Sequence, residues 1–230
     1  MKKIFFFAAA LVAAATINAE TYDFSKYATE ADWVVTDATK NATETKEDKL
    51  VYDITGGVEA VVSPKGAENI QFTIKNGSDK GKAFNINLGN SFEFGGKNGI
   101  IKLSGVQVGT SIKLVVAAKG STAADFADAA GVYPKGAIAV STDLTCPAKG
   151  SEGADEKGYV WKTLEYQATS GNVEIKEFAA GYRISSLTIG GTTAIDNTAV
   201  EAKATKYMEN GALVIVKNGV KYNALGAVIE

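Results

Sequence analysis

The sequence predicts an all-β protein: an antiparallel two-sheet β-sandwich of jelly-roll-like form, with a small β-element at its C-terminal end. Apolar and polar residues alternate in short runs, which is typical of strands with one buried and one solvated face. Glycine-rich turns separate the runs, and the chain has 24 glycines but only 3 prolines. About ten such runs at this spacing favour a sandwich over alternating β-α units.

The individual strands follow from the alternation. Ile70, Phe72 and Ile74 share one face of their run, as do the apolar residues of the other runs. The expected strands cover residues 49–54, 58–62, 70–74, 84–88, 91–94, 99–103, 112–116, 137–141, 160–166, 173–175 and 182–189. Two segments differ. The alanines of 122–130 predict a short helix or helical turn, and polar, glycine-rich 149–158 predicts a mobile loop.

The first 19 residues have the pattern of a cleavable secretory signal peptide. Lys2 and Lys3 precede an apolar stretch over 4–15, and Ala19 offers a small residue for cleavage. A membrane anchor is the alternative, but the stretch is shorter than the ~20 residues that span a bilayer. No second long apolar run follows. We therefore expect a secreted protein, extracellular or on the outer cell surface, without a transmembrane segment after signal removal.

The remainder divides into three parts. Residues 20–191 form the expected sandwich domain, and 192–205, which lacks strand alternation and large aromatic residues, is the expected linker. Residues 206–230 form the expected C-terminal β-hairpin tail. Its strand-like runs cover 212–216, 220–222 and 227–229, with a turn at Asn218-Gly219.

Composition excludes several chemistries. The chain has 24 basic and 26 acidic residues, and loss of Lys2 and Lys3 leaves 22 basic residues, a net charge of −4. This balance gives no reason to expect nucleic acid as a partner. The chain has no histidine, which excludes serine-histidine triads, cysteine-histidine dyads and typical zinc sites. Cys146 is the single cysteine, so no intrachain disulfide is possible, and without histidine a small buried or loop residue beside Pro147 is favoured over a nucleophile.

Three segments and the tail carry a resemblance. They are Tyr22-Asp23-Phe24-Ser25 with Trp33, the run from Phe92 to Ala123, and the run from Gly171 to Gly190. They resemble the carbohydrate-binding-like β-sandwich domains of secreted Bacteroidota proteins. The tail from Asn210 to Gly226 resembles modules associated with type IX secretion and surface retention. The resemblance implies a glycan or surface protein as partner, and secretion machinery as a partner of the tail.

Acidic residues are the only candidates for catalysis or metal binding. Glycoside hydrolysis needs two carboxylates at a set separation, but no spacing singles out a pair among Glu93, Asp125, Asp128, Asp143 and Glu165. We therefore assign no catalytic residue. A structural calcium ion stays open, because related sandwiches carry one and oxygen ligands are available. Its candidate ligands are Asp23, Asp125 and Asp155-Glu156.

Aromatic residues are the candidates for ligand binding, because a sugar ring packs its C–H face on an aromatic ring while polar neighbours bond its hydroxyl groups. The candidates are Trp33, Tyr133, Tyr159, Trp161 and Tyr182. Each has a structural alternative: Trp33 could seal the sandwich edge and Tyr182 could belong to the core. Trp161 is out of phase with the apolar face of its strand, which favours exposure. The sequence thus predicts a non-catalytic, glycan-binding or adhesive surface protein. The alternatives are a structural assembly subunit and a carboxylate-dependent glycan-cleaving enzyme.

Overall fold

The computed structural model describes residues 19–54, 58–75, 82–94, 99–127, 132–192, 205–209, 212–217, 220–223 and 228–229. The chain divides into two compact units, Met1–Thr192 and Thr193–Glu230, which are described separately. The predicted signal peptide, apart from Ala19, lies outside the described residues. So does the predicted linker, apart from its two end residues, which belong to strands.

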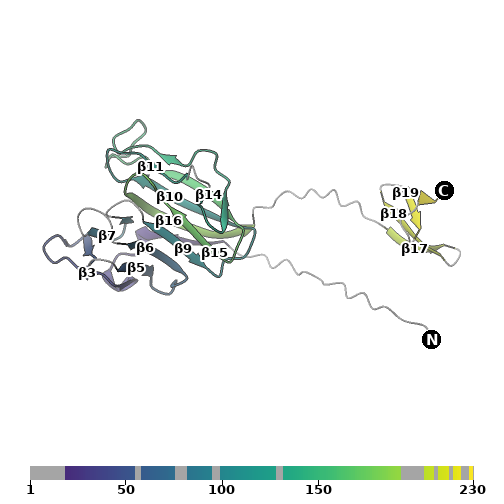
Figure 1. Ribbon diagram of the computed structural model, residues 1–230, viewed down its shortest axis with the longest axis horizontal. Coiled ribbons are helices and arrows are strands. Elements are labelled where there is room, and N and C mark those ends of the chain that lie inside the picture. Colours follow the sequence, from purple (N-terminus) through teal and green to yellow (C-terminus); the bar gives the residue numbers. More distant parts are fainter. Residues whose placement is uncertain are drawn as a thin grey trace. The chain divides into compact units, whose positions relative to one another are not determined.

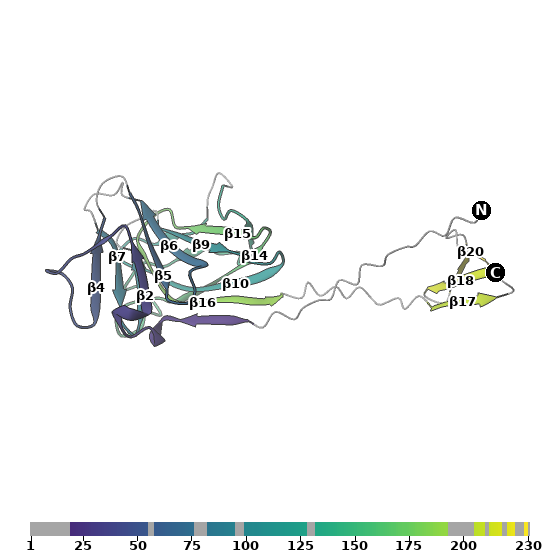
Figure 2. The ribbon, with the colours of Figure 1, turned by 90° about the horizontal axis from the view of Figure 1, so that it is seen from below.

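The first unit is an all-β sandwich of two antiparallel sheets (Figures 1 and 2). The larger sheet has nine strands, of which eight follow the order β12-β14-β10-β16-β8-β7-β4-β3, and β1 pairs with β16 beside β8. In that order, with β1 last, their bounds are Ala137–Ala139, Lys162–Ala168, Thr110–Ala118, Tyr182–Thr192, Ser91–Phe94, Lys82–Asn87, Lys49–Asp53, Thr39–Lys40 and Glu20–Asp23.

The smaller sheet has five strands in the order β15-β9-β6-β5-β2. Their bounds, in that order, are Asn172–Lys176, Ile100–Ser104, Ile70–Lys75, Glu59–Pro64 and Trp33–Thr36. A separate pair joins β11 (Ala124–Asp125) to β13 (Thr145–Cys146). Two 3₁₀ turns, η1 (Phe24–Lys26) and η2 (Glu30–Asp32), connect β1 to β2.

The predicted fold class is confirmed, and each predicted strand of the body has a counterpart. The helix or helical turn predicted over 122–130 is wrong for residues 122–127, and the rest of that range lies outside the described residues. Ala124 and Asp125 instead form β11, which pairs with Thr145 and Cys146. Ala124 and Phe126 are both buried, so the local pattern is the alternation of a strand. Here tertiary pairing outweighs the helix propensity of alanine.

Aromatic side chains join the two sheets in the core. Phe72 on β6 of the smaller sheet stacks on Phe92 on β8 of the larger sheet, with 4.5 Å between ring centroids. Phe84 and Phe94 pack around Phe92 at 5.7 and 4.9 Å. All four rings are fully buried. Such rings contribute large apolar areas, which suits a body without disulfides.

The second unit is a small four-stranded antiparallel sheet in the order β17-β18-β19-β20. Its strands are Thr205–Glu209, Ala212–Lys217, Val220–Asn223 and Val228–Ile229. The three predicted tail strands are present. The first strand, β17, was not predicted, and it pairs along its whole length with β18. Across the residues described in both units, no helix is long and apolar enough to cross a bilayer.

Candidate functional site

Two of the five candidate aromatic residues belong to the core. Trp33 is 7% exposed, and its ring packs against Phe24 at 5.6 Å and Phe92 at 5.9 Å. Tyr182 is fully buried, and its hydroxyl donates to the Gly99 carbonyl at 3.4 Å. A ring within the sandwich cannot offer its face to a sugar. The assignment of Trp33 and Tyr182 as ligand-binding residues is therefore corrected, and their structural alternatives hold.

Tyr159 and Trp161 come together at a pocket of about 280 Å³. Their ring centroids lie 6.0 Å apart. Tyr159 is largely buried, and Trp161, which directly precedes β14, is partly exposed. The other lining residues are Asn90, Asp155, Glu156, Lys157 and Arg183. The pocket thus combines two aromatic rings with carboxylate, amide, ammonium and guanidinium groups.

Asp155 holds the aromatic pair in place. Its Oδ1 accepts hydrogen bonds from the backbone N–H groups of Tyr159 at 2.8 Å and Lys157 at 2.9 Å. Its Oδ2 accepts from the indole Nε1 of Trp161 at 2.9 Å. These hydrogen bonds, first that from the Tyr159 backbone, lower the pKa of Asp155 below its usual range. The indole and the backbone before it are thus fixed by one carboxylate.

The segment before Tyr159 forms a closed loop, although its composition predicts mobility. Gly150 N–H donates to the Gly158 carbonyl at 2.8 Å, and Asp155 N–H donates to the Tyr159 carbonyl at 2.9 Å. The Lys149 N–H ties the loop to the Gly120 carbonyl at 2.7 Å. The Lys149 ammonium lies 4.5 Å from the centroid of the Tyr159 ring. These contacts give the pocket a defined wall.

Arg183 joins the pocket to the larger sheet. Its neighbours on β16, Tyr182 and Ile184, point into the core, so Arg183 points to the outer face of the sheet. Its guanidinium carbon lies 4.2 Å from the centroid of the Tyr159 ring. The same guanidinium pairs with Glu93, which is directly opposite on β8, at 2.5 Å.

Glu93 is the most buried carboxylate of this network. Its side chain is 2% exposed, and besides Arg183 it contacts Lys119 at 3.2 Å and accepts from the Asn85 amide at 2.5 Å. Burial alone would raise the pKa of Glu93, but the charges of Arg183 and Lys119 hold this pKa below its usual value. Glu93 is therefore an ionised anchor for Arg183.

Tyr133 is part of a different group. It is partly buried, its ring lies 5.6 Å from that of Phe178, and its hydroxyl is 3.5 Å from Oε2 of Glu174 on β15. Glu174 belongs to the smaller sheet, whereas Arg183 belongs to the larger one. The five aromatic residues predicted from the sequence therefore do not form a single site.

The other acidic residues weighed for glycoside hydrolysis, none of which was assigned a catalytic role, have ion-pair or turn contacts where the structure describes them. Glu165 pairs with Lys113 at 2.8 Å and Asp143 pairs with Lys162, while Asp125 accepts from the backbone of Ala127 at 2.9 Å. Asp128 lies outside the described residues. Burial raises the pKa of the Cys146 thiol to about 12, which agrees with a structural thiol.

The calcium prediction stays a prediction. Asp23 accepts from the backbone N–H of Ser25 at 3.0 Å, Asp125 accepts from Ala127, and Asp155 accepts from its own loop. Each of these carboxylates caps a local turn. Among the described residues, no three acidic or cysteine side chains gather as a metal site.

No protein-family model, curated protein or solved structure matches this chain. The site must therefore be interpreted from its own geometry. Arg183 and Asn90 were not recognised in the sequence. A signal for Arg183 existed, because it is the single arginine among 24 basic residues and it interrupts a strand between two apolar neighbours. Asn90 lies in a turn, and nothing in the sequence distinguishes it from other turn residues.

Proposed function

We propose that this protein is a non-catalytic glycan-binding protein, and that the Tyr159–Trp161 pocket is its sugar site. The observation that carries the proposal is the pocket itself, in which a partly exposed indole lies beside Asn90, Asp155 and Arg183. An exposed aromatic surface beside planar polar groups suits a pyranose ring, which is apolar on its C–H faces and polar around its rim.

The hydrogen bonds of the site support this assignment. The Asp155 carboxylate fixes the indole through Nε1, and its oxygens are also close enough to the pocket to accept from a sugar hydroxyl. Because the ring is held before the ligand arrives, little conformational entropy is lost on binding. The partly exposed ring of Trp161 supplies the stacking surface, while the largely buried ring of Tyr159 supports it from beside.

The charge of the pocket favours an uncharged sugar. Asp155 and Glu156 balance Lys157 and Arg183 among the lining residues, so the lining carries no net charge. A neutral hexose unit therefore meets no net electrostatic penalty here. The proposal includes secretion to the cell surface, supported by the signal-like residues 1–19 and by the resemblance of the tail to secretion-associated modules.

The first experiment is a glycan array with the protein lacking residues 1–19, with and without calcium, followed by calorimetry on the best neutral ligand. We expect Trp161→Ala to weaken binding by about 2- to 12-fold, the range of an aromatic stacking contact. Because Trp161 is partly exposed, the melting temperature should change little, whereas truncating a buried Trp costs about 3–5 kcal/mol. Tyr27→Ala, which removes another partly exposed ring that does not line this pocket, is the matched control.

The outcomes separate the alternatives. Weaker binding by Trp161→Ala with normal binding by Tyr27→Ala supports the pocket. If no neutral glycan binds, or if both variants bind like the unchanged protein, the proposed site is wrong. A large loss of stability in Trp161→Ala would place this ring in the core.

One observation favours a second candidate, the assembly subunit. Near the edge strand β12, three large apolar side chains are exposed: Val132 by 51%, Ile138 by 54% and Val140 by 48%. An uncovered edge with apolar residues can pair with another chain. Sedimentation should then show concentration-dependent association that Ile138→Lys abolishes, and a strictly monomeric protein would exclude this candidate.

A further inference from the structure

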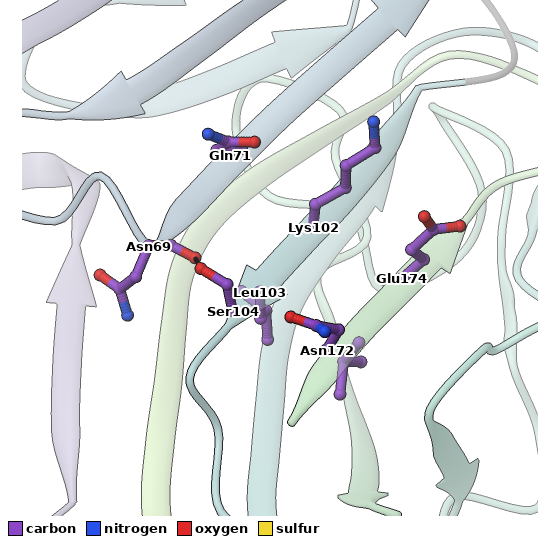
Figure 3. A pocket seen from close by; sticks show the side chains of 8 residues that line it. Asn69, Gln71, Lys102, Leu103, Ser104, Asn172 and Glu174 are labelled. Atoms are coloured by element: carbon purple, nitrogen blue, oxygen red, sulfur yellow. Dashed lines mark hydrogen bonds between the residues drawn. The ribbon is translucent and has the colours of Figure 1, made fainter. Parts of the chain in front are cut away.

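The outer face of the smaller sheet carries a second, polar groove (Figure 3). It has a volume of about 240 Å³. Its polar lining comes from three adjacent strands and the turn before β6: Asn69, Gln71, Lys102, Ser104, Asn172 and Glu174. This groove shares no lining residue with the Tyr159–Trp161 pocket.

Strand register places these side chains in two rows. Gln71 on β6, Lys102 on β9 and Glu174 on β15 lie side by side across the sheet. One step along, Ser104 on β9 is opposite Asn172 on β15. The residues between them on each strand, such as Phe72, Leu103 and Val173, are buried in the core. Alternation therefore turns both rows outward.

The groove is rich in amide groups that no other side chain uses. Within the described part of the chain, the side-chain amides of Asn69, Gln71 and Asn172 form no hydrogen bond. Each amide can donate and accept. Three such groups next to the Ser104 hydroxyl suit a ligand with many hydroxyl groups.

The same outer face is positively charged. Alternation and register place four lysines and two glutamates on it, a net charge of +2, whereas the whole chain carries −2. These residues are Lys75, Lys102, Lys135, Lys176, Glu59 and Glu174. Lys102 pairs with Glu59, and Lys135 pairs with Glu174 at 3.5 Å. The two glutamates are thus already matched by two of the lysines.

Aromatic rings border the face beside β15. The Lys135 ammonium lies 4.8 Å from the centroid of the Tyr133 ring, and the Lys176 ammonium lies 5.5 Å from it and 4.9 Å from the Phe178 centroid. Lys135 is held there by a two-way backbone pairing with Glu174 at 2.9 Å. The border therefore combines two ammonium groups with two aromatic rings.

From these observations we infer that the outer face of the smaller sheet binds an acidic glycan, a chain of sugar units that carry carboxylates. The amides bond the hydroxyl groups, and Tyr133 packs against a sugar ring. Lys176, which is not one of the two lysines paired with these glutamates, attracts a carboxylate. The inference rests on the proposed function only for the chemical class of the ligand. The outer face of the smaller sheet is separate from the Tyr159–Trp161 pocket, so an experiment can refute the inference without refuting the proposed sugar site, and the reverse.

The test uses oligomers of galacturonic acid and neutral oligomers of equal length, measured by calorimetry with the whole chain lacking residues 1–19. We expect Lys176→Gln to weaken binding of the acidic oligomer by up to about fivefold, the range of an exposed ion pair. Raising the salt from about 0.02 M to about 0.5 M should weaken it further, because exposed charges become screened. Binding of neutral oligomers should not change.

Lys113→Gln is the matched control. Lys113 also lies on a strand and pairs with a carboxylate across the sheet, Glu165 on β14, but it belongs to the larger sheet. Lys113→Gln removes the same charge as Lys176→Gln and should leave binding of the acidic oligomer unchanged. Asn172→Ala should weaken binding at all salt concentrations, because the amide contact is less screened than a charge pair.

Three results would overturn the inference. One is the absence of any binding of the acidic oligomer at low salt. Another is an equal loss of binding in Lys176→Gln and Lys113→Gln, or a loss in Trp161→Ala alone, which would place the ligand elsewhere. The third is equal binding of an acidic peptide or a nucleic acid through Lys176, which would show a face without preference for glycans.

Discussion

Replacing Arg183 by methionine tests the network below the Tyr159–Trp161 pocket. Methionine keeps an unbranched apolar chain but removes the charge that faces Glu93. The side chains of Arg183 and Glu93 are 15% and 2% exposed, so this is a buried ion pair. Removing one partner of a buried pair costs about 3–5 kcal/mol, because the other charge is left without compensation.

Lys119 reduces this cost. Its ammonium lies 3.2 Å from Oε1 of Glu93, and the Lys119 side chain is 33% exposed, so Glu93 keeps one counter-charge on a partly exposed side chain. We therefore expect Arg183→Met to lower the free energy of unfolding by about 2–3 kcal/mol. In a domain of this size each kcal/mol corresponds to about 2–4 °C, so the melting temperature should fall by about 5–10 °C.

Urea unfolding followed by tryptophan fluorescence measures the effect, because both tryptophans, Trp33 and Trp161, belong to the sandwich unit. Lys113→Met is the control: it breaks the Lys113–Glu165 pair, whose side chains are 46% and 32% exposed, and should cost less than about 1 kcal/mol. If both variants unfold at the same urea concentration, the Arg183–Glu93 pair is not the buried anchor described above.

Three further predictions concern protonation, thiol reactivity and backbone strain. Because the pKa of Glu93 is lowered in the folded state, its contribution to stability is complete above the ordinary value of 4.5 and is lost as the pH falls below it. In Glu93→Gln the urea midpoint should therefore depend less on pH below about pH 4.5 than in the unchanged protein. The same dependence of the midpoint on pH in both proteins would contradict this. Cys146, with its pKa raised to about 12, should resist iodoacetamide at neutral pH until urea unfolds the body. Gly136 has a φ of +67°, and a Cβ there would lie 2.0 Å from the Asn172 carbonyl oxygen. Gly136→Ala should therefore unfold at clearly lower urea than Gly105→Ala, which has a similar φ of +71° and open space around it.

Most strands of the body were predictable because they have one buried and one more solvated face, although all four residues of β8 are buried. In β6, for example, Ile70, Phe72 and Ile74 are buried while Gln71 and Lys75 lie toward solvent. The segment at Ala124 shows the limit of this reasoning. Its alanines favour a helix locally, but its partner, Thr145–Cys146, lies about twenty residues away, and no local propensity indicates that pairing.

The site was only partly predictable for a related reason. The sequence places Trp161 out of phase in a strand that starts at residue 160, but β14 begins at Lys162, and Trp161 directly precedes it with a partly exposed ring. The same argument cannot separate Trp33 or Tyr182 from a surface ring, because an aromatic residue fits both a core and a binding face. Arg183 and Glu93 are far apart in sequence, and they meet only because β16 pairs with β8.

The position of β16 has a consequence for the order in which the body can fold. Tyr182–Thr192 is the last strand of the sandwich in sequence, yet it lies between β10 on one side and both β8 and β1 on the other. Glu20 at the start of β1 is registered with Ile189 near the end of β16. The pairings of β16 thus cannot form until nearly the whole domain has been synthesised. Its pairings with β1 and β8 join residues that are far apart in the sequence. Folding dominated by such contacts is slow, so the nascent chain stays open and accessible to chaperones for an extended time.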